Sequence, residues 1–364
     1  MTEISVVNWR NLARQKICLG EQLNIFCGDN AQGKTNLAES VYLCCLGKSP
    51  RNNADKELIR HGQNEAYVRV KYVCRYGEGQ IEVTLNAREK KQIRVNSVPI
   101  ARTGDLMGYL NCVYFAPDEI RIVSDSPAER RRFMDIDLCQ TDKNYFYGLS
   151  RFNKALAQRN NLLKQAQSVE QLEETVFVWD KQLADEGAKI VLKRRAFCDK
   201  LKELAKQTHG ALTDGKETLE LHYTTALKGA NAAEIAQNYR ELLSANAEKD
   251  FALRHTSAGC QRDDVSLKLN GSDVRTFGSQ GQLRTTALSL KLAELKIFYE
   301  LIGEYPVLIL DDVLSELDPL RQKRLLNFDP QLQILLTAAT DVPRGAVGEN
   351  CKFFEINQGV CTEK

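Results

Sequence analysis

Eight consecutive residues near the start of the chain have the types and the spacing that bind a triphosphate. They form the pattern G-x-x-x-x-G-K-T, in which glycines let backbone N–H groups turn towards phosphate oxygens. Lys34 can reach the β- and γ-phosphates, and the Thr35 hydroxyl can bind Mg²⁺. We therefore predict a loop that binds ATP and Mg²⁺, and an ordinary glycine turn before a helix is the alternative. Its residues are Gly28, Asp29, Asn30, Ala31, Gln32, Gly33, Lys34 and Thr35.

A pair of acids, Asp311 and Asp312, follows the apolar run Val307–Leu310. Such a run is typical of a central strand in a parallel sheet, whose carboxyl end faces the ligand crevice. There Asp311 can hold Mg²⁺ together with Thr35, and Asp312 can orient or deprotonate the attacking water. We predict Asp311, Asp312 and Lys34 as catalytic residues. Capping of a following helix is the alternative for an acid in this place.

A third segment, Gly278–Gln282, combines glycines, a serine and the start of a helix. Helix N-termini favour anions, so Ser279, Gly281 and Gln282 are predicted nucleotide contacts. A plain serine N-cap is the alternative reading of this segment. Ser315–Asp318, just after the paired acids, reads in isolation as a turn followed by a helix cap.

These segments need a mixed α/β fold to position them. Leu23–Cys27 is predicted to be a strand ending at the phosphate loop, and residues 36–46 a buried helix after it. Three alternating runs, residues 67–73, 81–85 and 92–95, predict an antiparallel meander with one wet face. Further strands are predicted at residues 265–269, 306–310, 333–337 and 353–356, with a helix over 282–301.

The middle of the chain is predicted to be helical. Apolar residues recur at three- and four-residue spacing from Tyr145 to Leu163 and from Leu172 to Leu204, which indicates two long helices packed on each other. We expect an α/β head made of residues 1–120 and 250–364, interrupted by a helical lobe at residues 121–249.

Composition sets broad limits on the class of protein. The net charge of this 364-residue chain is only +2, so a nucleic-acid surface would have to be local. No apolar run approaches the ~18 residues of a membrane span, and no secretory signal is visible. The 11 cysteines form no C-x-x-C pair, which indicates reduced thiols in a cytoplasmic protein and argues against a zinc site.

In their order along the chain, these motifs resemble the ABC-type ATPase heads of the SMC family. Gly278–Gln282 resembles the signature motif of those heads, and Ser315–Asp318 resembles their D-loop. In that family the signature serine and glycine contact the γ-phosphate bound by the other subunit. Asn30 and Asn36 also suit the SMC-like phosphate loop, and the resemblance points to Arg10 and Asn11 for adenine contacts.

Nearly the whole chain is similar to the RecF family of bacterial recombination mediators. The resemblance implies an ATP-dependent homodimer that binds double-stranded DNA near single-strand gaps or junctions and helps RecR and RecO load recombinase. It implies roles in recombinational repair, replication restart and the SOS response, with weak DNA-stimulated ATP hydrolysis as a switch. The matching segments are Gly28–Thr35, Pro127–Phe133, Arg262–Asp264, Gly278–Arg284 and Asp311–Asp318.

The chain departs from the pattern of these families in three places. Asp312 stands where ABC heads have a catalytic glutamate, and no histidine follows the run Ile334–Thr337 to act as a switch. Gly259-Cys260-Gln261 stands where the RecF family has Gly-Pro-His. The shorter reach of Asp312 to a water fits slow turnover.

Basic residues gather at the start of the helical lobe, where Arg130, Arg131 and Arg132 are the predicted DNA contacts. Phosphate binding needs only spaced cations and reads no sequence. A solvated helix face is the alternative for each of these residues.

Two other functions are alternatives to an ATP-dependent clamp that binds DNA, which is the function that the resemblance implies. One is a P-loop nuclease or kinase acting on a nucleic acid or nucleotide, although the sequence shows no further acidic cluster and only four scattered histidines. The other is an SMC-like tether, for which the helical region is short and lacks hook cysteines.

Overall fold

The computed structural model describes residues 1–51, 54–339 and 350–364. The chain forms two compact units, one of Met1–Glu119 with Glu294–Lys364 and the other of Ile120–Ala293. This division differs from the predicted one at its second boundary, because residues 250–293 group with the helical unit. The reason is that the strand β10 (Asp264–Leu269) pairs with β9 (Leu219–Thr224) inside that unit.

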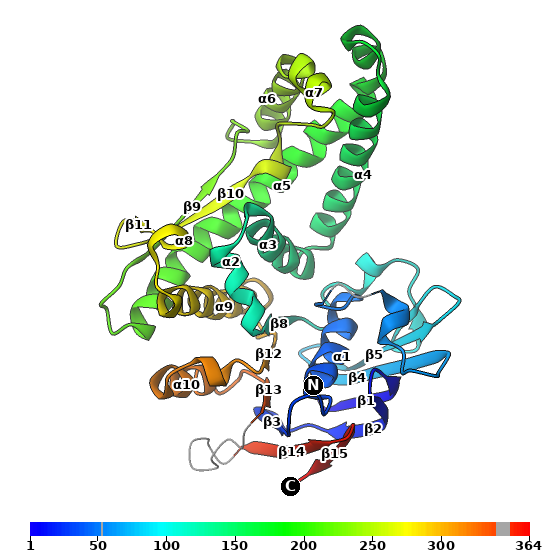
Figure 1. Ribbon diagram of the computed structural model, residues 1–364, viewed down its shortest axis with the longest axis vertical. Helices are drawn as coiled ribbons and strands as arrows, with labels where there is room; N and C mark the ends of the chain where they lie inside the picture. Colours follow the sequence, from blue (N-terminus) through cyan, green and yellow to red (C-terminus); the bar gives the residue numbers. More distant parts are fainter. Residues whose placement is uncertain (52–53, 340–349) are drawn as a thin grey trace. The chain divides into compact units, whose positions relative to one another are not determined.

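The first unit contains a mostly parallel sheet in the order β15-β14-β3-β13-β12-β8 (Figure 1). Strands β3, β12 and β13 are buried along their whole length, as expected for central parallel strands. β13 lies between β3 and β12 in parallel register, so the carboxyl ends of all three strands reach the same edge. The strands are β3 (Leu23–Cys27), β8 (Cys112–Phe115), β12 (Val307–Asp311), β13 (Ile334–Ala338), β14 (Cys351–Asn357) and β15 (Val360–Glu363).

The second sheet of this unit is antiparallel, in the order β2-β1-β4-β5-β6-β7. The predicted meander is its β4-β5-β6 portion, and alternate residues of β4 and β5 are buried. Helix α1 (Lys34–Leu46) packs on β12 and β13 of the parallel sheet and on β1, β4 and β5 of this sheet, so it is buried nearly all round. The strands are β1 (Glu3–Trp9), β2 (Leu12–Cys18), β4 (Glu65–Cys74), β5 (Gly77–Asn86), β6 (Gln92–Val95) and β7 (Val98–Pro99), and the unit also contains helix α10 (Pro319–Leu326).

The second unit is built on two long antiparallel helices, α4 (Lys143–Gln165) and α5 (Val169–Leu212) (Figure 1). Two ion pairs fix their direction, because Arg151 pairs with Glu186 at 3.0 Å while the later Arg159 pairs with the earlier Asp180 at 2.6 Å. The two predicted helices are thus confirmed. Helix α9 (Gln280–Ile302) begins in this unit and ends in the first.

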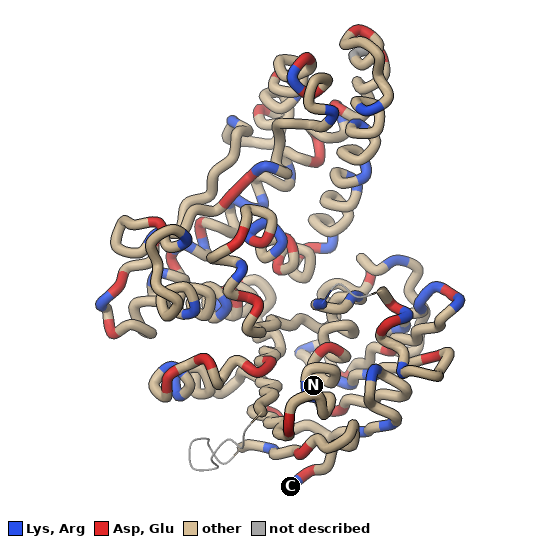
Figure 2. Tube along the Cα trace, in the orientation of Figure 1, with Lys and Arg blue, Asp and Glu red and all other residues tan. Residues whose placement is uncertain are grey.

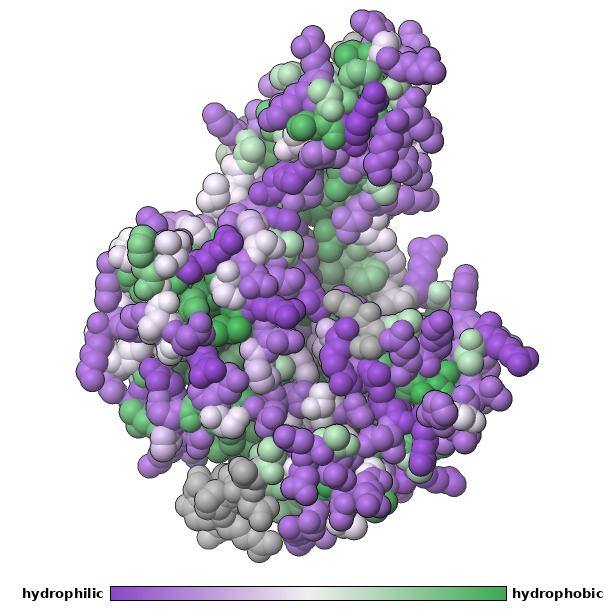
Figure 3. Space-filling view, viewed as in Figure 1, coloured by the Kyte–Doolittle hydropathy of each residue, from purple (hydrophilic) through white to green (hydrophobic). Residues whose placement is uncertain are grey.

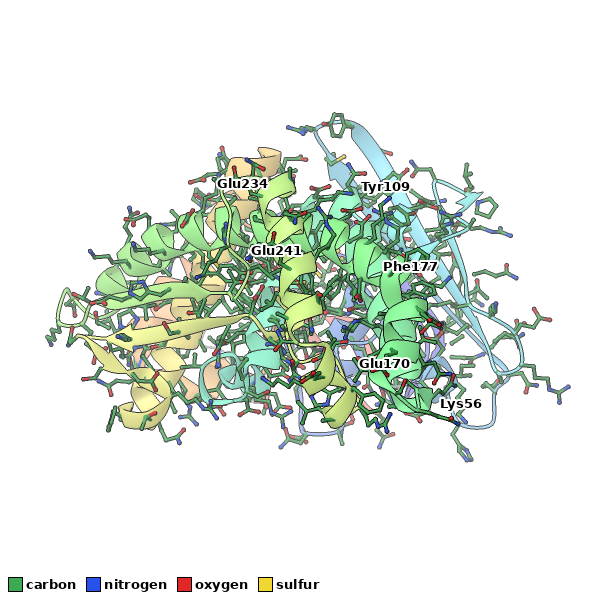
Figure 4. The ribbon with its side chains drawn as sticks, turned by 90° about the horizontal axis from the view of Figure 1, so that it is seen from above. Lys56, Tyr109, Glu170, Phe177, Glu234 and Glu241 are labelled. Atoms are coloured by element: carbon green, nitrogen blue, oxygen red, sulfur yellow. The ribbon has the colours of Figure 1, made fainter. Side chains whose placement is uncertain are left out.

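Smaller elements cover the long helices. Helix α6 (Ala232–Ala245) packs Ile235, Tyr239 and Leu243 on α5, while Glu234 and Glu241 lie on its exposed side (Figure 4). This unit also contains α2 (Arg121–Ser124), α3 (Pro127–Thr141), α7 (Ala247–Leu253), α8 (Val274–Phe277) and β11 (Ser272–Asp273).

Hydrophilic side chains cover most of the face shown in Figure 3, and the apolar ones gather in small patches. Among the described helices, none combines the length and the apolar character needed to cross a membrane.

Candidate nucleotide-binding site

The phosphate loop joins the buried strand β3 to helix α1. Helix α1 begins at Lys34, and its N-cap, Gly33, offers no side chain to the first N–H groups of the helix. The donors of the first turn of a helix have no partners within the helix, so they are available to an anion. The sequence pattern therefore lies in the local structure that phosphate binding requires.

Two glycines allow this loop its shape. Gly28 has φ +151°, and a Cβ there would lie 2.2 Å from the backbone oxygen of Ile356. Gly33 has φ +120°, and a Cβ there would lie 2.8 Å from Asn11 Oδ1. Both positions lie in a region that side chains rarely adopt, and both are closed sterically as well. The motif glycines are thus required by the fold before any ligand is considered.

Residues far apart in the sequence hold the loop in place. Gln32 Oε1 accepts from the Gln358 N–H at 2.5 Å, and the Gln32 carbonyl accepts from the Gly359 N–H at 3.1 Å. Asn11 Nδ2 donates to the same carbonyl at 2.9 Å. Gln32 is therefore an anchor of the loop, whereas Asp29, Asn30 and Ala31 lie exposed on its outer side.

Lys34 is buried, and its ammonium lies inside the loop. Nζ donates to the carbonyl of Gly28 at 2.5 Å and to that of Asp29 at 2.8 Å. The residue is only 6% exposed, so its charge is directed into the loop and away from solvent. This placement suits a cation that binds phosphate oxygens.

Asp311 and Thr35 come together at the edge of the parallel sheet. Thr35 Oγ1 donates to Asp311 Oδ1 at 2.9 Å, and Thr337 Oγ1 donates to the same oxygen at 2.7 Å. Tyr114 Oη donates to Asp311 Oδ2 at 2.7 Å, so both carboxylate oxygens are oriented. A hydroxyl and a carboxylate at this separation are the oxygen ligands that Mg²⁺ prefers, and the site fits that ion. The structure thus joins the two halves of the predicted metal site.

Tyr114 was missing from the sequence-based prediction. Burial, and then the neighbouring Asp311 carboxylate, raise the pKa of its hydroxyl far above the usual range. Tyr114 therefore stays protonated and donates to the carboxylate. Tyr114 lies in β8, the strand next to β12, and this position becomes evident only from the strand order.

Asp312 has a left-handed backbone, with φ 57°. Its N–H donates to Thr337, both to the hydroxyl at 3.1 Å and to the carbonyl at 3.2 Å. A non-glycine residue in this conformation is uncommon and is held here by its neighbours. The predicted role of Asp312 towards water stays a prediction.

A buried ionic cluster that the sequence analysis missed supports the first turns of α1. The side chain of Glu39 is fully buried between Arg10 and Arg51, and Arg10 Nε donates to it at 2.9 Å. Arg51 also donates to Asn36 Oδ1 at 2.8 Å, and Asn36 donates to Asn11 at 2.8 Å. Burial alone would raise the pKa of Glu39, but hydrogen bonds from Arg10, Arg51 and Ser49 outweigh it and hold that pKa below its ordinary value. The signal available in the sequence was that Glu39 is the single acidic residue of this largely buried helix.

The signature-like segment belongs to the second unit. Ser279 Oγ accepts from the Gln282 N–H at 3.3 Å, and Gln282 Oε1 accepts from the Ser279 N–H at 2.9 Å, which is a reciprocal capping box. Ser279 and Gly281 are exposed, and a Cβ at Gly281 would meet nothing nearer than Ser279 Oγ at 4.0 Å. The serine cap is therefore present, and the predicted nucleotide contact stays a prediction.

The predicted DNA contacts lie on α3, and one of them needs correction. Arg130 is buried and donates to both oxygens of Asp264, at 2.7 and 3.1 Å, so it has a structural partner. Arg131 donates to the Asp263 carbonyl at 2.6 Å and is partly exposed, and Arg132 lies 3.5 Å from Glu129 near the surface. Of these three arginines, Arg131 and Arg132 keep part of their surface exposed, and their contact with DNA stays a prediction.

Two arginines of the long helices in this unit are buried in the same way. Arg159 bonds Asp180 and Asp250, each at 2.6 Å, and Arg194 bonds Asp135 at 2.9 Å. Figure 2 shows basic and acidic positions interspersed in this unit. Counting cations along the helices therefore overstates the positive surface.

Comparisons with known proteins agree with this geometry. The family model described as "AAA domain" matches residues 3–250. The chain is 42% identical to "DNA replication and repair protein RecF" of Alkaliphilus oremlandii, covering 98% of both chains, and 40% identical to the protein of that name from Clostridium novyi, covering 99% of both. The solved structure described as "Structure of the recombination mediator protein RecF-ATP in RecFOR pathway" superposes with a TM-score of 0.91 at 33% identity, covering 100% of this chain and 97% of the other.

The SMC heads share the fold at lower sequence identity. An Smc head domain from Pyrococcus furiosus superposes with a TM-score of 0.59 at 15% identity, covering 100% of this chain and 95% of the other. The predicted ABC-type head fold is thereby confirmed.

Proposed function

Because the chain belongs to the RecF family, we propose that it is an ATP-switched clamp on double-stranded DNA that acts in recombinational repair. The observation that carries this proposal is the hydrogen bond between Thr35 and Asp311, at 2.9 Å, which joins the phosphate loop to the acid of β12. Relatives carry the name "DNA replication and repair protein RecF", and one similar structure is described as RecF-ATP.

ATP binds with its phosphates at the N-terminus of α1. The backbone N–H groups of the loop and the Lys34 ammonium meet the phosphate oxygens. Thr35 and Asp311 would hold Mg²⁺, and the ion would supply positive charge to offset that of the phosphates. Asp312 orients the attacking water. The hydrogen bond from its N–H to Thr337 fixes the backbone and so limits where its short side chain can reach. Slow hydrolysis, stimulated by DNA, resets the clamp.

ATP joins two copies of the chain. The phosphates bound by one copy are contacted by Ser279 and Gly281 of a second copy. The exposure of both residues, with open space around Gly281, supports such a contact. The helix N-terminus capped by Ser279 favours the negative charge of a γ-phosphate.

The dimer binds double-stranded DNA near a single-strand gap and assists RecR and RecO in loading recombinase. Arg131 and Arg132 supply phosphate contacts, which read no sequence. The similar RecF-ATP structure is described as belonging to the RecFOR pathway, and this supports the proposed partners.

The test measures the mass of the protein in solution with ADP, ATP and a non-hydrolysable analogue, with and without duplex DNA. We expect a dimer with ATP and the analogue, and a monomer with ADP. Ser279→Arg should still bind ATP but should neither dimerise nor turn over. Ser272→Arg, at an exposed serine of the same unit, is the matched control and should behave as the wild type. Dimerisation of Ser279→Arg at the wild-type affinity would refute the shared site.

A further inference from the structure

The side chain of Gln282 has a partner outside the capping box. Its Oε1 accepts from the Ser279 N–H, while its Nε2 donates to Glu217 Oε1 at 2.8 Å. A hydrogen bond to a carboxylate is stronger than one between neutral groups. Glu217 therefore fixes which way the Gln282 amide faces, and that amide in turn holds the backbone of Ser279.

The second carboxylate oxygen of Glu217 contacts His209. Glu217 lies in the connection between α5 and β9, and its Oε2 is 3.2 Å from His209 Nε2 in the last turn of α5. An ionised carboxylate has no proton to donate, so it can only accept hydrogen bonds. His209 Nε2 therefore carries the proton in this contact. The His209 side chain is fully buried and that of Glu217 is 22% exposed.

The other ring nitrogen of His209, Nδ1, contacts helix α9. Ser289 Oγ donates its single proton to the Thr285 carbonyl at 2.6 Å. Nδ1 lies 2.9 Å from Ser289 Oγ, and it must therefore be the donor in this contact, so both ring nitrogens carry a proton here. The hydrogen bonds therefore form a closed circuit from the start of α9, through Glu217 and His209, to a point about two turns along the same helix. Such a circuit leaves the first turn of α9 few alternative arrangements.

We propose that Glu217, backed by His209, is a positioning residue for the signature-like segment Gly278–Gln282. It keeps Ser279 and Gly281 in the arrangement that meets the γ-phosphate of a second copy, and it ties that arrangement to the end of the long helix α5. The inference rests on the proposed function, since it assigns Glu217 to the contact made between two copies.

Two variants separate a hydrogen-bonding role from a merely structural one. Glu217→Ala removes the acceptor, whereas Glu217→Gln keeps an oxygen that can accept from Gln282 Nε2. The new amide NH2 then faces His209 Nε2, which accepts from it once the ring is neutral with its proton on Nδ1. Glu220→Ala is the matched control, because Glu220 also faces a histidine, His222 at 3.7 Å, but both of these side chains are exposed.

The first measurement needs no second copy and no nucleotide. In Glu217→Ala, amide hydrogen exchange in residues 278–284 should speed up about tenfold, with residues 285–293 as the internal reference. Glu217→Gln and Glu220→Ala should exchange as the wild type does. Unchanged exchange in Glu217→Ala, or equal defects in Glu217→Ala and Glu217→Gln, would overturn the positioning role.

The second measurement is dimerisation with a non-hydrolysable ATP analogue. Glu217→Ala should dimerise about tenfold more weakly, while the affinity of the monomer for nucleotide stays at the wild-type value. Normal dimerisation of Glu217→Ala, in a preparation where Ser279→Arg fails to dimerise, would overturn this inference and leave the proposed function standing. If Ser279→Arg itself dimerises normally, the proposed function is refuted, and hydrogen exchange still decides whether Glu217 positions the segment.

Discussion

Replacing Arg130 by alanine tests whether this residue holds the fold together or binds DNA. The guanidinium donates to both oxygens of Asp264 and to the carbonyls of Ile122 and Asp125. Its side chain is 7% exposed and that of Asp264 is 34% exposed. We expect Arg130→Ala to lower the free energy of unfolding and to leave the electrostatic part of DNA binding unchanged.

The expected loss of unfolding free energy depends on how well the Asp264 carboxylate is compensated once Arg130 is removed. Breaking a buried pair by removing one partner costs about 3–5 kcal/mol, because the other charge stays without compensation. Water can reach a third of Asp264 and recovers part of this cost, so we expect a loss of about 2–4 kcal/mol. The Arg132–Glu129 pair is more exposed, and Arg132→Ala should cost about 0–1 kcal/mol.

Two assays on the same proteins separate the roles. Urea unfolding gives the free energies, and a salt titration of duplex DNA binding counts phosphate contacts, each worth about 0.9 in the slope of log K against log salt concentration. Reversing Arg131 and Arg132 together to glutamate should flatten that slope. If Arg130→Ala unfolds like the wild type and flattens the slope by about one contact, the structural assignment of Arg130 is refuted.

Three further outcomes concern the nucleotide site. Tyr114→Phe removes the donor to Asp311 Oδ2, so it should cost about 1–2 kcal/mol of stability and raise the Mg²⁺ concentration for half-maximal ATP turnover; an unchanged Mg²⁺ titration would contradict this. Gly28→Ala would place a Cβ 2.2 Å from the Ile356 carbonyl, so we expect ATP binding, measured by calorimetry, to be lost. The folded-state pKa of Glu39 is depressed, so its contribution to stability is present above the unfolded value and is lost as the pH falls through the folded value. The difference in unfolding free energy between wild type and Glu39→Gln should therefore shrink in acid, and a constant difference would argue against that pKa.

The parts of the site that sequence could predict are those set by local spacing. The loop from Gly28 to Thr35 needs its glycines and its lysine at fixed offsets, so the pattern alone identified it. Asp311 was identified because an apolar run before it indicated a central strand, and the parallel register of β12 and β13 then brings it to the edge. In each case one segment carries both the chemistry and its structural setting.

The features that the sequence did not predict depend on which distant segments of the chain contact each other in the fold. Arg130 and Arg194 resemble surface cations in a sequence, and only the fold places Asp264 and Asp135 against them. Strand β9 was not predicted because it is only six residues long and partly polar. Because β9 pairs with β10, the boundary between the two units differs from the predicted one.

The phosphate loop shows the same dependence within a motif that the sequence identified. Strand β3, which leads into the loop, pairs on its two sides with β13 and β14, both from the last part of the chain. The Gln32 side chain is bonded to Gln358 at the hairpin after β14, and the Gly28 backbone passes too close to Ile356 for any Cβ. Residues more than three hundred positions away therefore determine the path of a loop whose sequence looks self-sufficient. The local pattern supplies the chemistry for a triphosphate, and the C-terminal strands supply the rigid frame that holds this chemistry in place.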